Sequence, residues 1–225
     1  DVTPIHVTRV ELEGATVLTS AQADALTRSV VGRTVTLQQL RELAQAVTHW
    51  YRRRGYVTTR AVVPAQSVEA GVVRVRVVEG RVGAIRVEGN RHVSAKQIAR
   101  TLGVASGQLL RLPALESGLI RLNAHPDRTV RVVMAQGLEP GATDLILQVE
   151  DRHPLHAAYG VDTLGSEVTG RVRQTLSLAH RNLTGVDDQL AALGIIAEFG
   201  GIKGGLVSYV RPVTARGTAL TFTWD

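Results

Sequence analysis

The sequence predicts an α+β protein in which two tandem β-α-α-β-β modules precede a run of antiparallel β-strands. Helical and strand-like patterns follow one another in the same order twice, about 75 residues apart. Both repeats end on a similar apolar-acidic signature, Val78-Glu79 and Val149-Glu150. After Asp151 no helical period is found. We therefore expect one module at residues 1–80, a second at 81–151, and only strands at 152–225.

The first module begins with an expected strand at residues 5–13, before a turn at Gly14. Its first helix has Thr19 or Ser20 as its N-cap, and Gly32 stands where a C-cap is expected. A second helix has Thr36 as its N-cap and ends at Gly55, since apolar residues recur between them at steps of three and four.

Two strands complete the first module, at residues 56–63 and 71–79. In the second of them, Val73, Val75 and Val77 alternate with Arg74 and Arg76. This alternation predicts one buried face and one solvated face.

The second module repeats the order, with residues 85–89 in the position of residues 10–14. Ser94 is the expected N-cap of one helix, and Pro113 begins another. Strands are expected at residues 129–135 and 142–150.

The last part of the chain consists of segments of about nine to thirteen residues separated by Gly, Asn, Asp and Pro turns, the length a tilted strand needs to cross a membrane. Several apolar side chains fall on one face of these strands, and we expect that face to contact lipid: Val168, Val172, Leu176, Leu178, Leu220, Phe222 and Trp224. A soluble meander or sandwich is the alternative.

Composition narrows the functional classes. Residues 1–150 hold 19 Lys and Arg against 13 Asp and Glu, whereas residues 151–225 hold 7 of each, so the net charge of +6 lies in the two modules. There is no cysteine, no histidine spacing typical of a metal site, no phosphate-binding glycine loop and no nucleophile signature. We therefore expect no catalytic residue, no metal, no cofactor and no enzymatic activity.

The order and spacing of short motifs resemble a known family. Tyr51-x-x-x-Gly55-Tyr56, followed by Val78-Glu79-Gly80, resembles the first polypeptide-transport-associated (POTRA) domain of the outer-membrane transporters of two-partner secretion, the haemolysin-activator type (TpsB). Leu122-Asn123-x-x-Pro126 is similar to a motif of their second POTRA domain, and Asn182-Leu183-x-Gly185 to the first turns of their β-barrel.

The resemblance implies a periplasmic recognition portion, located at the bacterial outer membrane, that captures the extended N-terminal secretion domain of a secreted client protein. Capture would proceed by β-augmentation, in which the client adds a strand to an exposed sheet edge. The expected client-binding edge residues are Val57, Thr58, Thr59, Arg60 and Val62 in the first module, and Thr129, Arg131, Val133 and Ala135 in the second. We expect proline at Val133 to remove a main-chain donor from that edge.

Two other functions stay open at this stage. A barrel-assembly factor carries the same modules, and a soluble nucleic-acid-binding domain would fit the pI of 10.4. The low aromatic content of 4% argues against nucleic acid as a partner. The family's complete barrel needs more strands than this chain offers, so we expect a truncated piece whose open edges and apolar face favour self-association.

Overall fold

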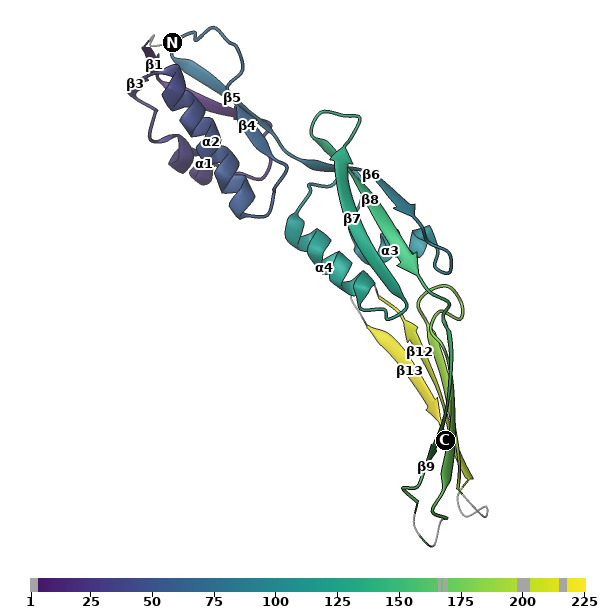
Figure 1. Ribbon diagram of the computed structural model, residues 1–225. Coiled ribbons are helices and arrows are strands. Elements are labelled where there is room, and N and C mark those ends of the chain that lie inside the picture. Colours follow the sequence, from purple (N-terminus) through teal and green to yellow (C-terminus); the bar gives the residue numbers. More distant parts are fainter. Residues whose placement is uncertain (1–3, 166, 168–169, 198–202, 215–217) are drawn as a thin grey trace. The chain divides into compact units, whose positions relative to one another are not determined.

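The computed structural model describes residues 4–165, 167, 170–197, 203–214 and 218–225. It divides into two compact units, one of residues 1–86, 104–116 and 134–145, and one of residues 87–103, 117–133 and 146–225. Figure 1 shows the elements in chain order from purple to yellow.

The first repeat has the predicted helices and a sheet with one additional pair of short strands. Its elements are β1 (Ile5–Val7), β2 (Arg9–Glu13), α1 (Ser20–Thr27), β3 (Arg33–Val35), α2 (Leu37–Arg53), β4 (Arg60–Val62) and β5 (Val72–Val78). β2, β5 and β4 form a sheet in that order, in which β2 is parallel and β4 antiparallel to β5. β1 pairs separately with β3.

Helix α2 follows its sequence signals closely. The Thr36 side chain accepts a hydrogen bond from the Gln39 N–H and the Gln39 side chain accepts one from Thr36, which confirms the predicted cap as a capping box. Its apolar stripe packs on Val73, Val75 and Val77 in one buried core. The predicted alternation of β5 is therefore confirmed.

Two predictions for the first repeat are wrong in detail. The strand expected at residues 5–13 is broken at Thr8, because the Thr8 and Arg9 N–H groups both donate to the Gly71 carbonyl. Gly32 is not the C-cap of α1, which ends at Thr27 with Arg28 as its cap. Gly32 instead adopts φ +75° and donates to the Val7 carbonyl at the start of the β1–β3 pair.

The second repeat consists of β6 (Arg81–Glu88), α3 (Ala95–Leu102), α4 (Leu112–Asn123), β7 (Arg128–Gln136) and β8 (Ala142–Asp151). Its sheet has the order β6-β8-β7. Ser94 is the N-cap of α3, as predicted, and Gly103 ends this helix in the left-handed conformation.

The remaining strands form one antiparallel sheet in the order β13-β12-β11-β10-β9. They are β9 (Leu155–Asp162), β10 (Arg173–His180), β11 (Gln189–Ala197), β12 (Lys203–Pro212) and β13 (Ala219–Trp224). No helix occurs in the described residues after Asp151, as predicted. Among the described helices, none has the length and apolar character needed to span a membrane.

Candidate functional site

The edge of the first sheet is formed by β4, which is shorter than predicted. Arg60 and Val62 lie opposite Val78 and Arg76 of β5, and Ala61 points its N–H the other way. That N–H already donates to the Thr48 hydroxyl of α2 at 2.9 Å. The edge donor of β4 is therefore occupied within the module.

The strand prediction for Val57, Thr58 and Thr59 is wrong, because these residues form a turn before β4. The Thr59 side chain is buried and its hydroxyl accepts a hydrogen bond from the Gly80 N–H at 3.0 Å. A Cβ on Gly80 would lie only 1.9 Å from the Thr58 hydroxyl. The close approach of Gly80 therefore packs this turn against the end of β5 and removes it from the sheet edge.

The loop after β4 closes the next stretch of β5. The Gln66 side chain accepts a hydrogen bond from the Arg74 N–H at 2.8 Å and donates to the Arg74 carbonyl at 2.7 Å. These two bonds imitate those of a paired strand. Where β4 ends, a side-chain amide thus takes the place of the missing strand.

The edge of the second sheet is formed by β7, which has nine residues against three in β4. At one end of the β7–β8 hairpin the Gly137 N–H donates to Ala142, and at the other the Arg152 N–H donates to Asp127. These pairs are ten residues apart on both strands, so the register runs without a bulge. Main-chain groups alternate in direction along a strand. The odd-numbered residues of β7 therefore face β8, and the even-numbered ones face the edge.

Asn123, at the end of α4, confirms this direction. Its side chain accepts a hydrogen bond from the Val130 N–H at 2.7 Å and donates to the Val130 carbonyl at 3.0 Å. The next main-chain groups that face the edge are those of Val132, Met134 and Gln136. Because β7 is the outer strand of its sheet, no strand pairs with these groups, and no other hydrogen bond to them is found among the described residues.

The predicted edge residues of the second module all lie in β7, but they belong to the set whose main-chain groups face β8 and not to the set that faces the edge. Thr129, Arg131, Val133 and Ala135 direct their N–H groups at β8. Proline at Val133 would therefore break the β7–β8 ladder and not the edge. Sequence reasoning missed Asn123 as a partner of the strand, although it is part of the Leu122-Asn123 motif.

Each module also has a buried or half-buried carboxylate that holds the loop after its first strand. Glu79 accepts hydrogen bonds from the Thr16 and Val17 N–H groups at 2.7 and 3.1 Å and from the Tyr51 hydroxyl at 2.6 Å. Burial alone would raise the pKa of Glu79, but the hydrogen bonds from Thr16, Tyr51 and Val17 outweigh it and lower that pKa. Burial and the same carboxylate raise the pKa of Tyr51.

In the second repeat, Asp151 holds the corresponding loop. It accepts hydrogen bonds from the Arg91, His92 and Val93 N–H groups at 2.7 to 3.1 Å. Burial opposes the charge of Asp151, and the three N–H groups outweigh this effect and lower its pKa. In both modules, a carboxylate thus binds main-chain N–H groups of the loop after the first strand.

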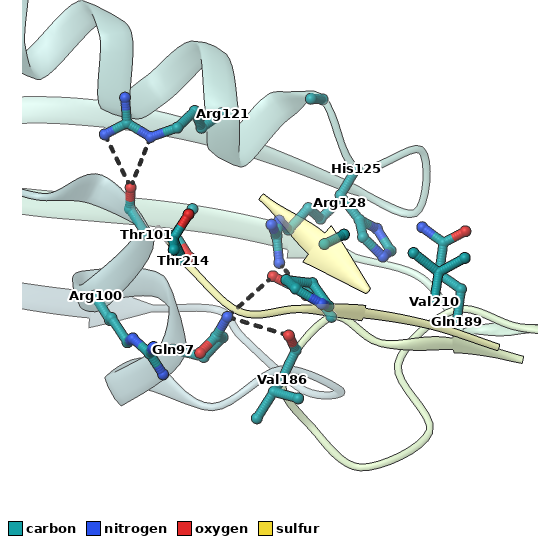
Figure 2. A pocket seen from close by; sticks show the side chains of 14 residues that line it. Gln97, Arg100, Thr101, Arg121, His125, Arg128, Val186, Gln189, Val210 and Thr214 are labelled. Carbon is teal, nitrogen blue, oxygen red and sulfur yellow. Dashed lines mark hydrogen bonds and ion pairs between the residues drawn. The ribbon is translucent and has the colours of Figure 1, made fainter. Parts of the chain in front are cut away.

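The turn between β10 and β11 is fastened to the second repeat by a charged network. The Arg128 guanidinium, with its side chain only 4% exposed, lies 2.7 Å from the Asp187 carboxylate and also donates to the Leu122 carbonyl. Asn182 donates to the His92 carbonyl at 2.8 Å. A hollow of about 360 Å³ lies beside the ion pair, and Figure 2 shows Arg100 and Arg121 on its border. Arg121 is committed to the α3 carbonyls of Thr101 and Leu102.

The register of the last sheet places the predicted lipid-facing residues on one side. Leu178 lies opposite Ala192, which lies opposite Val207, which lies opposite Trp224, and residues directly opposite share a face. By the same register, this face also carries Leu176, Leu220 and Phe222, which are all about half exposed, as are Leu178 and Trp224. Val172 lies just before β10, and Val168 lies outside the described residues.

Comparison with known proteins bears on the fold and the family of the chain. Residues 5–80 match the family model described as "POTRA domain, ShlB-type". The chain is 30% identical over 181 residues to the outer membrane transporter CdiB of Dickeya dadantii (strain 3937), a match that covers 80% of this chain and 32% of the relative. It is 28% identical over 165 residues to the heme/hemopexin transporter protein HuxB of Haemophilus influenzae (strain 86-028NP), covering 72% of this chain and 29% of HuxB.

The solved structure of CdiB from Escherichia coli superposes with a TM-score of 0.71 at 25% identity, over 99% of this chain and 46% of that chain. The fold is therefore that of POTRA domains followed by antiparallel strands. The chain is therefore related to the outer-membrane transporters of two-partner secretion, whose POTRA domains lie in the periplasm, and its residues 5–80 are a POTRA domain of the ShlB type. It spans about a third of the length of the curated relatives it matches.

Proposed function

We propose that this chain is the periplasmic recognition portion and the first pore strands of a transporter that captures an extended secreted protein by β-augmentation. The observation that carries this proposal is the run of unpaired main-chain groups along the edge of β7. Main-chain hydrogen bonds give affinity for an extended chain without requiring one sequence. A folded client offers no free strand and is not expected to bind.

The named relatives support the transport of a protein client. CdiB and HuxB are both named as transporters, and the match to CdiB covers nearly the whole chain in structure. The alternative, insertion of other barrels into the membrane, has no comparable support from the named relatives. We therefore propose protein secretion, with a client that presents an extended N-terminal segment.

The experiment needs a candidate client, for which we would take a large secreted protein encoded by a gene adjacent to this one, and it uses the N-terminal segment of that protein. The segment is unfolded in urea, diluted onto the immobilised chain, and compared with the same segment after refolding. We expect binding of the unfolded segment and at least tenfold weaker binding of the folded one. Equal binding of the two forms would overturn capture of an extended client.

We further propose that the apolar face of the last sheet contacts outer-membrane lipid. Trp224 is on this face, and the other tryptophan, Trp50, is buried in the first core. In a Trp50→Phe variant reconstituted in bilayers, brominated lipid should quench the fluorescence of Trp224 strongly. An unquenched Trp224 would contradict the lipid-facing assignment.

A further inference from the structure

We infer that the client strand pairs with residues 132–136 of β7, here called the open edge, and that Asn123 sets where this pairing stops. The inference rests on the proposed function, because it specifies the site of a β-augmentation that the function requires. It also excludes the edge of the first module, where five of the nine client-binding residues expected from the sequence lie.

The edge strands of the two modules differ in the main-chain groups that they leave free for a client strand. In β4 only Ala61 faces the edge, and its N–H is bound to Thr48. Beyond the end of β4, Gln66 occupies the N–H and carbonyl of Arg74. The first module therefore offers an incoming strand no free donor within β4 and no free position at Arg74.

In β7, by contrast, three residues have main-chain groups that are free to pair with a client strand. Val132, Met134 and Gln136 each point an N–H and a carbonyl at the edge, with no partner among the described residues. Val130 is excluded, since the Asn123 amide already makes the two bonds that a neighbouring strand would make. An added strand can therefore extend along the open edge only as far as Val132.

Side chains on the open edge define the kind of strand that fits. Val132 is half-buried and Met134 is 42% exposed, and both lie on the face where Val130 is buried. On the opposite face Arg131 is exposed beside Glu150. The client strand should thus carry apolar side chains at every second position, on the Met134 side, and polar ones between them.

The other edge strand of each module, β2 in the first and β6 in the second, is less suited to pair with a client strand. β2 displays Arg9, Glu11 and Glu13, which form ion pairs with one another and with Arg74, and charged side chains discourage strand addition. The first part of β6 is covered by the loop at residues 107–110, since Val82 exchanges hydrogen bonds with Gly107 and Gln108.

The test measures binding of the urea-unfolded client segment named above to the whole chain carrying Val132→Pro or Met134→Pro. Proline is tolerated at an edge position whose N–H faces away from the sheet, so both variants should fold. Each removes one donor and places a ring in the path of the client strand, and we expect binding at least about tenfold weaker. The matched control in the first module is Ala61→Pro, which places the same ring at the edge-facing position of β4 and should leave binding unchanged, because the client does not pair there.

Amide hydrogen exchange with and without the client segment separates the possible failures. Protection of Val132, Met134 and Gln136 on binding, with Val130 unchanged, is the expected result, and in Asn123→Ala the new protection should extend to Val130. Protection confined to β2, β4 or β6 would overturn the inference while leaving β-augmentation standing. Binding that protects no strand edge would overturn the proposed function itself.

Discussion

The two POTRA-like repeats have a similar order of elements, but their edge strands differ in how many main-chain groups are free to pair with another strand. In the first, a hydroxyl from α2 and an amide from the following loop occupy the groups that a strand would use, and the edge strand has three residues. In the second, a single amide from α4 occupies one position of a nine-residue strand. Equivalent folds thus give one closed edge and one open edge, because short polar side chains can substitute for a neighbouring strand.

The largest expected effect is a difference in stability between proline substitutions at two neighbouring positions of β7, one facing β8 and one facing the edge. Val133→Pro removes a donor from the β7–β8 ladder and should destabilise the chain by about 3 kcal/mol or more, whereas Val132→Pro should cost about 1 kcal/mol. Urea denaturation monitored by circular dichroism measures both. Equal losses in the two variants would mean that the alternation along β7 is assigned wrongly.

The second prediction compares the carboxylates that close the modules. Glu79→Gln should cost about 2 kcal/mol, because the donors from Thr16, Val17 and the buried Tyr51 lose a charged partner and an amide NH2 group replaces the oxygen that accepts from the Thr16 hydroxyl. Asp151→Asn should cost less, since its bonds are to the main chain of residues 91–93 alone, of which Arg91 and His92 are exposed. Thermal melts at pH 7 compare the two.

The same carboxylates predict an acid dependence with a definite sign. Both have a pKa that is lowered in the folded chain, so the stability they contribute is complete above their unfolded pKa values of about 4 and is lost as the pH falls through the folded values. The difference between the parent and Glu79→Gln should therefore shrink below about pH 4. A difference that stays constant down to pH 2 would contradict the role of the charged form.

A smaller effect is expected from the side chains that cap the edges. Asn123→Ala leaves the main chain of the buried Val130 unpaired and should cost about 1 to 2 kcal/mol. Thr48→Val leaves one N–H unpaired and should cost about 1 kcal/mol. Chemical denaturation of the two single variants and of the double variant should give additive losses, because the two sites share no partner.

Much of the fold could be predicted from local patterns. The Thr36 cap and the alternation of Val73, Val75 and Val77 depend on nearest neighbours in the chain, and both are found as expected. The break at Thr8 was not predictable in this way, since it is caused by Gly71, far along the sequence.

The direction of main-chain groups could not be predicted either. Periodicity shows that residues of β7 alternate, but which set faces the edge depends on the register with β8 and on Asn123. The alternation alone therefore favours Val132 and Val133 equally, and only the register shows that the N–H of Val132 faces the edge. Likewise, a strand over residues 56–63 fits the local composition, and only the packing of Thr58 and Thr59 on Gly80 shows that it is shorter.

The central claim, an open edge on β7 and a closed edge on β4, can be tested directly by amide hydrogen exchange of the chain without any client. Exchange rates followed residue by residue should be slow at Val130, Arg131 and Val133, and fast at Val132 and Met134, while Ala61 should be slow because of Thr48. Uniform protection from Val130 to Met134, or a rapidly exchanging Ala61, would contradict the account.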